Sequence, residues 1–255
     1  MVLALLLMLM ATGCHHHHRK AEELPPEKTA PVVGEQSPQA VRGHGGQRPA
    51  PIPPTPAPPG GVNEEDLEYV ASHKPIWSER GIASWYRAPY KGRKMANGQV
   101  FDDNSMTAAQ RTLPMGSLIK VTNLATGQNA VMRVTDRGPF IEGRVVDLTV
   151  ASAKATGVYL PGSSVVRVDV YRAPKPIETG GRWCVQIGAI SDENYALFLK
   201  QKLKEHYPDA NVIEFPGENR FWVRIRPLND DREQAEKIAH HLKLREGTAF
   251  LTRLD

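Results

Sequence analysis

The sequence predicts two small folded domains, an all-β barrel followed by a four-stranded α+β domain, both behind a proline-rich tether that we expect to be disordered. Three observations lead to this prediction. The stretch 15–74 holds eleven of the chain's 21 prolines. Between residues 77 and 173, short runs of β-forming residues alternate with turn signals. From 182 to 255 the pattern reads β-α-β-β-α-β, and a length of 255 residues accommodates two such domains.

Charge is unevenly distributed along the chain. The formal net charge is +4, yet residues 78–172 carry 13 Lys and Arg against 7 Asp and Glu, whereas residues 182–255 carry 12 of each. The excess over the whole chain is too small to indicate a nucleic-acid-binding protein. Two cysteines, Cys14 and Cys184, exclude a disulfide framework and a Cys-rich zinc module.

The N-terminus indicates the compartment. Residues 1–13 form an apolar run, shorter than the roughly 20 residues that span a bilayer, and they fit a signal peptide. Ala11-Thr12-Gly13-Cys14 resembles a bacterial lipobox, which implies lipidation of Cys14 and attachment to a membrane. The alternative is ordinary export in which Cys14 is removed or left unmodified. If Cys14 is lipidated, Cys184 has no intramolecular partner, and we expect it to be a buried apolar side chain.

The tether is expected to span residues 14–76. Its polar, low-complexity composition cannot bury enough apolar surface to offset the entropy of ordering it. The tract His15–His18 could bind a transition metal, but no Cys or carboxylate partner is close in the sequence, so a solvated segment is favoured. Outside the cytoplasm, the basic barrel that follows is better suited to an anionic wall polymer or lipid surface than to nucleic acid.

Alternating runs and turn signals predict the elements of the barrel, residues 77–173. A short helix is expected over Thr149–Thr156, with Thr149 as its cap and Gly157 beyond its end. The expected strands are Gly81–Tyr86, Ser117–Asn123, Asn129–Thr135, Arg144–Leu148 and Ser164–Tyr171.

A linker over 174–181 leads to the second domain, residues 182–255. Ser191 is expected to cap a first helix with an apolar stripe from Ala196 to Tyr207, and a second helix starts near Asp230. The expected strands are Trp183–Ile187, Asn211–Phe215, Phe221–Ile225 and Phe250–Leu254. Such a sheet could be read as an RNA-binding module, but export and the balanced charge argue against nucleic acid.

A series of motifs recurs in order along the barrel: Gly81-Ile82-Ala83-Ser84-Trp85-Tyr86, Gly92-Arg93, Ala96-Asn97-Gly98, Thr107-Ala108-Ala109, Thr112-Leu113-Pro114, Val121-Thr122-Asn123-Leu124, Asp136-Arg137-Gly138-Pro139-Phe140 and Gly143-Arg144-Val145-Val146-Asp147-Leu148. This series resembles the rare lipoprotein A family, septal-ring lytic transglycosylases with a double-psi β-barrel. The resemblance implies non-hydrolytic cleavage of the β-1,4 bond between N-acetylmuramic acid and N-acetylglucosamine, on strands without stem peptides. The product would carry a 1,6-anhydro-muramyl end.

The resemblance also implies a polar site, and two of its three positions differ here. The family has Glu after Ala-Asn-Gly, His after Thr-Ala-Ala and Asp before Arg-Gly-Pro, whereas this chain has Gln99, Gln110 and Asp136. Amides exchange no protons near neutral pH, so only Asp136 can act as acid and base. One such group can suffice, because the muramyl 6-hydroxyl attacks its own anomeric carbon. Without the resemblance, Asp136 would be read as a turn or cap residue.

Further residues of the barrel are candidate sugar contacts. Gln99 and Gln110 could orient hydroxyl or acetamido groups, Tyr86 could stack on a sugar face, and Arg93 and Arg137 could pair with muramyl carboxylates. Each arginine is equally consistent with a solvated surface charge. Asp147 is a possible second carboxylate, but its position just before a helix favours a structural role.

The second domain has a resemblance of its own. Val185-Gln186-Ile187-Gly188-Ala189-Ile190 and Trp222-Val223-Arg224-Ile225 are similar to the sporulation-related repeat domain, which binds denuded septal glycan. Gln186 and Arg224 are therefore candidate glycan contacts, or else ordinary residues of the sheet surface. The chain has Arg226 where the family usually has Gly.

Two functions remain open from the sequence. The first is an endolytic lytic transglycosylase with Asp136 as its acid and base, and the second is a non-catalytic peptidoglycan-binding lipoprotein, which Gln99 and Gln110 favour. Both place the chain on the periplasmic face of the bacterial envelope, at the division septum, with septal cell-division proteins as partners. We expect no cofactor, no bound metal and no nucleic acid.

Overall fold

The structure is a computed structural model that describes residue 58 and residues 60–86, 92–216 and 220–255. The expected signal peptide, Cys14, the tract His15–His18 and most of the tether lie outside these residues, so what was expected of them stays a prediction. Within the described part of the chain, no helix is both long enough and apolar enough to cross a membrane.

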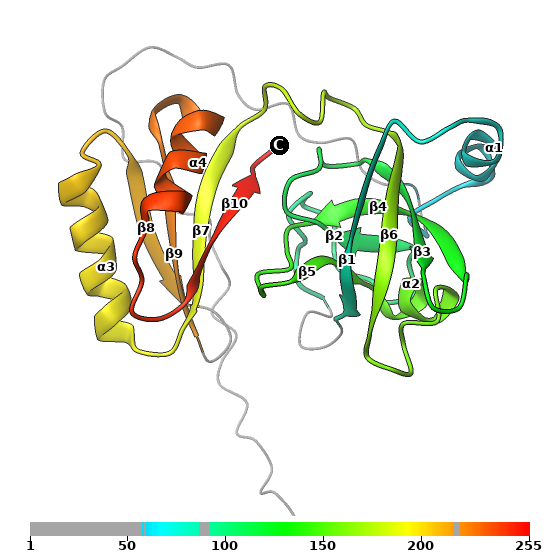
Figure 1. Cartoon of the computed structure of the whole chain (residues 1–255), viewed down its shortest axis with the longest axis horizontal. Coiled ribbons are helices and arrows are strands. Elements are labelled where there is room, and N and C mark those ends of the chain that lie inside the picture. Colours follow the sequence, from blue (N-terminus) through cyan, green and yellow to red (C-terminus); the bar gives the residue numbers. More distant parts are fainter. Residues whose placement is uncertain (1–57, 59, 87–91, 217–219) are drawn as a thin grey trace, which may run out of the picture. The chain divides into compact units, whose positions relative to one another are not determined.

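The first domain is a closed six-stranded barrel (Figure 1), as the sequence predicts. Its strands follow one another around the barrel in the order β1-β5-β2-β4-β3-β6. Five of them match expected strands. The sixth, β2, has only three residues, too few to show an alternating pattern. The strands are β1 (Trp77–Trp85), β2 (Thr107–Ala109), β3 (Leu118–Asn123), β4 (Asn129–Asp136), β5 (Arg144–Leu148) and β6 (Ser163–Arg172).

Inward-pointing aliphatic side chains fill the barrel. Alternate residues of its strands, among them Ala83, Ala108, Val134 and Val146, are fully buried in one hydrophobic cluster. Helix α2 (Val150–Ala155) adds Ala153 to this cluster. Its expected cap is confirmed, since the Thr149 side chain accepts a hydrogen bond from the backbone N–H of Ser152. The side chains that point outward from the same strands are available to form a site.

The expected tether is wrong at its C-terminal end, because residues Glu64–Ser72 form a helix, α1. Asn63 and Asp66 build a capping box at its start. Asp66 is buried and forms an ion pair with Arg133 of β4, and Val70 packs beside β3 and β6 in a small apolar cluster. The folded part of the chain therefore includes this helix, which the sequence analysis had assigned to the tether.

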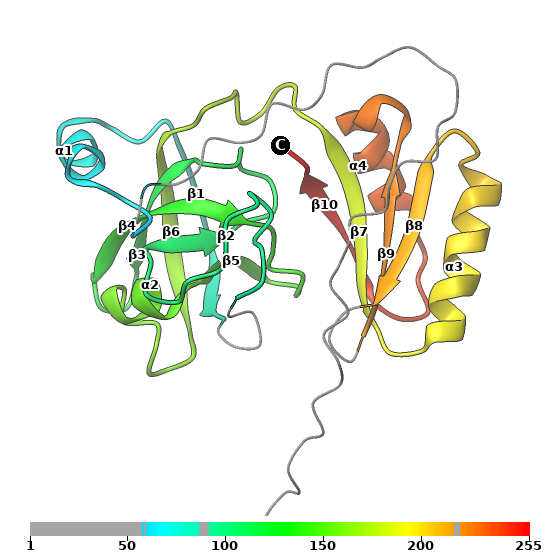
Figure 2. The same ribbon diagram turned by 180° about the vertical axis from the view of Figure 1, so that it is seen from behind.

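The second domain is a four-stranded antiparallel sheet with two helices (Figure 2). The strand order is β10-β7-β9-β8, which confirms the β-α-β-β-α-β prediction. Apolar residues of both helices and of one sheet face share a single core. The elements are β7 (Trp183–Ile190), α3 (Glu193–His206), β8 (Asn211–Pro216), β9 (Phe221–Arg226), a short 3₁₀ turn η1 (Leu228–Asp230), α4 (Arg232–His241) and β10 (Thr248–Arg253).

Two local expectations have different outcomes. Helix α3 is capped by Asp192, not by Ser191, because the Asp192 carboxylate accepts from the backbone N–H groups of Asn194 and Tyr195. Ser191 instead donates its backbone N–H to Glu246 at 2.6 Å. Cys184 is a buried free thiol, as expected, and burial raises its pKa to about 11.

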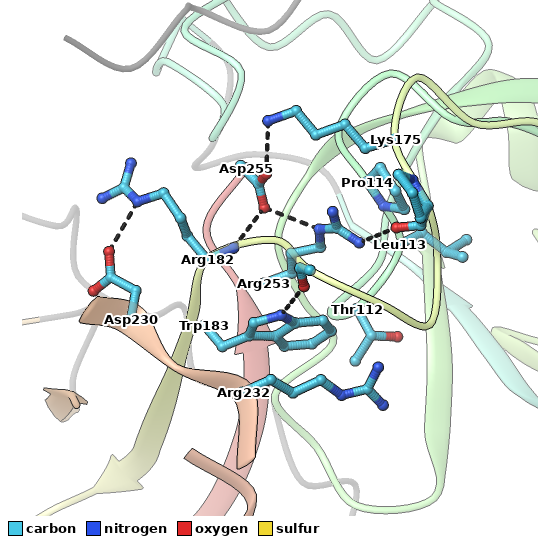
Figure 3. A network of polar contacts seen from close by, with 12 residues as sticks. Thr112, Leu113, Pro114, Lys175, Arg182, Trp183, Asp230, Arg232, Arg253 and Asp255 are labelled. Carbon is cyan, nitrogen blue, oxygen red and sulfur yellow. Dashed lines mark hydrogen bonds and ion pairs between the residues drawn. The ribbon is translucent and has the colours of Figure 1, made fainter. Parts of the chain in front are cut away.

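The expected linker 174–181 is held against the end of the second domain (Figure 3). Asp255 accepts hydrogen bonds from Lys175 Nζ at 2.6 Å, from the backbone N–H of Arg182 at 3.0 Å and from Arg253 Nε at 2.9 Å. Burial raises the pKa of Asp255, but these hydrogen bonds and charges outweigh it and leave the pKa well below its usual range. The Asp255 carboxylate thus anchors the linker through a permanently charged group.

Candidate active site

Asp136 is the last residue of β4, and a β-bulge aims its side chain. Ala108 pairs with Val134, but the next residue, Ala109, pairs with Asp136, so Thr135 is the extra residue of a bulge. Bulges are common beside active sites, where they redirect a side chain. Simple alternation would put Asp136 on the core side with Val134, whereas the bulge places it on the opposite side.

Asp136 belongs to a row of residues across four neighbouring strands. Ala109 pairs with Asp136 on one side and with Asp147 on the other, and Asp147 pairs with Ser84. Directly paired residues point to the same face of a sheet. Since the residues just before Ala109, Asp147 and Ser84 are in the core, the row lies on the outer face of strands β4, β2, β5 and β1.

The environment of Asp136 favours its protonated form. Burial raises the pKa of this carboxyl, and hydrogen bonds from the backbone N–H groups of Ala96 (3.0 Å) and Arg137 (2.8 Å), with the Arg137 charge, offset that only in part. Both bonds reach Oδ1. Among the described residues no hydrogen bond to Oδ2 is formed, so Oδ2 is the oxygen available to give and take a proton.

The second carboxylate of the row, Asp147, has both oxygens engaged. Ser84 Oγ donates to Oδ1 at 2.7 Å, and Arg144 donates to Oδ2 at 2.6 Å. Asp147 is buried, and its role is to fix Arg144 and the end of β5. This agrees with the structural reading that the sequence favoured.

Gln99 lies on a loop close to the segment of Asp136, and its role as a sugar contact stays a prediction. The loop that carries it crosses the end of β4, because the backbone N–H of Asn97 donates to the carbonyl of Thr135 at 3.2 Å. Asn97 Nδ2 donates to Gln99 Oε1 at 2.5 Å, which orients the half-buried amide. Gln99 also lines a cavity of about 310 Å³, together with Pro58, Gly60, Gly61, Met95, Val100, Asp102, Ser105 and Thr107.

Gln110 is not exposed to a ligand, in contrast to the expected sugar contact. Only 3% of the residue is accessible, and both ends of its amide are bonded inside the barrel. Its Oε1 accepts from the backbone N–H groups of Thr112 (2.5 Å) and Leu113 (2.6 Å). Its Nε2 donates to Glu79 Oε1 at 3.0 Å. Gln110 therefore organises the segment beside Asp136 rather than binding a sugar.

Arg137 is likewise committed to the protein. Its guanidinium donates to the backbone carbonyls of Gln110 (3.0 Å) and Leu113 (2.9 Å). This corrects the expectation of a muramyl carboxylate partner in this conformation. Arg93 is exposed, and Tyr86 is half-buried with its ring 5.0 Å from the ring of Phe101. Arg93 thus remains available as a charged contact, and Tyr86 presents only part of its ring.

Glu79 is the residue that the sequence analysis missed. It is half-buried on β1, and burial raises the pKa of its carboxyl despite the hydrogen bond from Gln110 and the positive charge of Arg111. Glu79 lies outside the motifs that carry the family resemblance, the first of which starts at Gly81. The signal that could have found it is alternation, because Trp77 and Ala83 of the same strand contact the core and Glu79 shares their face.

In the second domain, the predicted glycan contacts lie on the sheet face opposite the helices. Gln186 and Arg224 pair across β7 and β9, and Arg224 Nε donates to Gln186 Oε1 at 2.8 Å. Gln186 is only 2% accessible, so it orients Arg224 rather than forming an open contact. The ring of Trp222 lies directly over Gly188, where an added Cβ would come within 1.7 Å of it. This face therefore carries a half-buried aromatic ring and an arginine that Gln186 orients.

Arg226, which replaces the usual Gly of the motif, has a structural partner. It donates to both oxygens of Asp230 at 2.8 Å, and Arg182 donates to the same carboxylate. Burial raises the pKa of Asp230, but the two arginines outweigh it and lower the pKa below its ordinary value. The departure from the motif therefore stabilises the turn after β9.

Comparison with known proteins gives matches to both domains. The family model described as "Lytic transglycolase" matches residues 78–170, and the SPOR domain model matches residues 179–253. Proteins named endolytic peptidoglycan transglycosylase RlpA are similar over much of the chain. The relative from Vibrio cholerae is 46% identical over 162 residues, which cover 61% of each chain.

Two further relatives extend the alignment. That from Neisseria meningitidis is 39% identical over 169 residues, covering 64% of this chain and 71% of the relative. That from Pasteurella multocida is 32% identical over 186 residues, covering 69% of this chain and 63% of the relative. The chain thus spans less than two thirds of the Vibrio and Pasteurella proteins.

Proposed function

Because the chain belongs to the rare lipoprotein A (RlpA) family, we propose that it is an endolytic peptidoglycan lytic transglycosylase with Asp136 as its acid and base. The observation that carries this proposal is the state of Asp136: a carboxyl with a raised pKa and one oxygen not engaged by the described residues. A raised pKa keeps a larger fraction protonated, as the first step requires.

The reaction needs only this one proton carrier. Asp136 donates its proton to the glycosidic oxygen while the bond from that oxygen to the muramyl anomeric carbon breaks. The muramyl 6-hydroxyl attacks the same carbon and passes its proton to the Asp136 carboxylate. The carboxyl is restored, no water is consumed, and the products are a 1,6-anhydro-muramyl end and a free 4-hydroxyl.

Substrate contacts come from both domains in this proposal. In the barrel, Gln99, Tyr86 and Arg93 contact the substrate, while Gln110 and Arg137 hold the segment of Asp136 through hydrogen bonds inside the protein. In the second domain, Arg224, oriented by Gln186, and Trp222 bind denuded glycan. We place the protein at the division septum, on the periplasmic side of a membrane, tethered through lipidated Cys14 and working beside septal cell-division proteins.

A second candidate function is non-catalytic glycan binding, which the two amides favour. In the interior, the Gln110 side chain donates one hydrogen bond to Glu79 and accepts two from backbone N–H groups. A neutral histidine has one donor and one acceptor nitrogen, so it could replace Gln110 in part. The restored pair Gln99→Glu and Gln110→His is therefore a variant that the fold can accommodate.

The test is incubation of the full chain with amidase-treated sacculi, followed by mass analysis of the released fragments. Anhydro-muramyl ends from the wild type support the enzyme. No ends from the wild type, but ends from the Gln99→Glu/Gln110→His variant, would leave glycan binding as the function. Equal activity of the wild type and Asp136→Asn would overturn the role of Asp136.

A further inference from the structure

Glu79 and Asp136 lie on strands that are not neighbours, yet one side chain connects them. The barrel order β1-β5-β2-β4 puts two strands between the strand of Glu79 and that of Asp136. Gln110, directly after β2, spans the gap. Its side chain donates to Glu79, and its backbone N–H donates to the carbonyl of Asp136 at 3.1 Å.

Gln110 also takes part in the hydrogen bonds between the loop after β2 and the turn after β4. Its Oε1 holds the backbone of Thr112 and Leu113, and its own carbonyl accepts from the guanidinium of Arg137, which bonds Leu113 as well. Hydrogen bonds therefore join the segment after β2 to the turn after β4, which follows Asp136 directly.

Among the described residues, Glu79 on β1 accepts a hydrogen bond from Gln110 Nε2 and belongs to neither of these two loops. In the part of the chain that the structure describes, the Nε2 of Gln110 has one other acceptor, the hydroxyl of Thr112 at 3.3 Å, which belongs to the same loop as Gln110. Because Gln110 is almost inaccessible to water, losing Glu79 would leave the Nε2 of this amide poorly satisfied and its position less firmly held. The charged group that faces Glu79 is Arg111, whose guanidinium is bonded to the carbonyls of Pro139 and Arg144.

We propose that Glu79 is a positioning residue for Asp136, acting through the side chain of Gln110. The inference deepens the proposed function and rests on it as far as catalysis is concerned. It assigns a role to a carboxyl outside the family motifs. It also gives a reason for a half-buried acid on the face of β1 that Trp77 and Ala83 share.

The test compares Glu79→Ala with Glu79→Gln in the full chain. Glu79→Gln keeps an acceptor for Gln110 Nε2, so its kcat on denuded strands stays within about threefold of the wild type. Glu79→Ala lowers kcat by roughly tenfold to a hundredfold through misplacement of Asp136, with KM changed by less than about threefold. Arg80→Ala, at the exposed neighbouring residue, is the matched control and leaves both constants unchanged.

Coupling is measured with a double-mutant cycle. If Glu79 acts through Gln110, Glu79→Ala adds little to the loss caused by Gln110→Ala, and the double variant resembles the worse single one. Multiplicative losses would overturn the proposal. So would an unchanged kcat in Glu79→Ala, or equal losses in Glu79→Ala and Glu79→Gln.

A readout without activity separates this proposal from the function. In ¹³C NMR titrations of the full chain, Glu79→Ala should lower the titration midpoint of the Asp136 carboxyl by about half a unit or more, because a looser segment admits water. Glu79→Gln should leave the midpoint in place. If the wild type proves inactive on sacculi, the proposed function fails but these shifts still decide the positioning role. An unmoved midpoint in Glu79→Ala would overturn it.

Discussion

Two carboxyls of the barrel and two of the second domain have pKa shifts in opposite directions. In the barrel, Asp136 and Glu79 have raised pKa values, because burial outweighs the few charges and hydrogen bonds around them. In the second domain, Asp230 and Asp255 have lowered pKa values, because arginine side chains and, for Asp255, also Lys175 bond them directly. These opposite directions indicate where proton chemistry can occur. A carboxyl without a bonded arginine partner can exchange a proton, whereas one bonded by arginine side chains is a permanent charge that holds structure.

The largest effect expected from this contrast is on catalysis. Asp136→Asn removes the proton carrier but keeps the acceptor oxygen for the Ala96 and Arg137 N–H groups. Release of anhydro-muramyl ends should fall by about a hundredfold to ten-thousandfold, measured by mass analysis of digested sacculi. Glu142→Gln, an exposed barrel carboxylate, is the control and should match the wild type.

Asp136→Asn should lower activity but raise the stability of the folded protein at neutral pH. A raised folded-state pKa means that the native state binds more protons than the unfolded state, so stability falls as pH rises from the unfolded pKa through the folded one. At neutral pH Asp136→Asn should therefore melt at a higher temperature than the wild type. The gain should disappear below about pH 4, where both states are protonated. A lower melting temperature at pH 7 would contradict the environment assigned to Asp136.

Asp230 provides the matching test in the second domain. Asp230→Asn leaves Arg226 and Arg182 without their charged partner and should destabilise the protein by about 2–4 kcal/mol at neutral pH. The lowered pKa means that this stabilisation is present above the unfolded pKa and is lost as pH falls through the folded one. Denaturant titration at several pH values measures it. Asp209→Asn, an exposed acid, is the control.

A smaller effect, that of Gly188→Ala, should separate glycan binding by the second domain from catalysis by the barrel. Gly188→Ala forces the ring of Trp222 to move, since the new Cβ would overlap it. Binding to denuded sacculi should weaken by about threefold to tenfold, while the rate on soluble glycan fragments, which depends on the barrel, should not change. A pull-down and a fragment assay on the same preparation distinguish the two. Equal losses in both assays would mean that the domains do not divide the work.

The smallest effect is expected at Arg93. Arg93 is exposed, so Arg93→Ala should weaken sacculus binding by no more than about threefold, and the difference should vanish at high salt. Binding isotherms at two ionic strengths measure it. A loss that persists at high salt would indicate a desolvated contact rather than a surface charge.

Local patterns predicted most of the elements but not their outer limits. Strands with clear alternation and the Thr149 cap were found, because those signals depend only on neighbours in sequence. Helix α1 was assigned to the tether because a proline-rich composition precedes it, although Asn63 and Asp66 form a readable capping box. Strand β2 was missed since three residues carry no period.

The motifs alone identify the family, the two domains and Asp136 as the sole acid among the three motif positions. The role of each polar residue is visible only in the three-dimensional fold. A bulge at Thr135 turns Asp136 to the outer face, and burial sets its protonation. Gln110 is enclosed by the barrel, and Glu79 reaches it from a strand two places away. The physical reason is that burial and hydrogen-bond partners come from residues distant in sequence, and no local pattern encodes them.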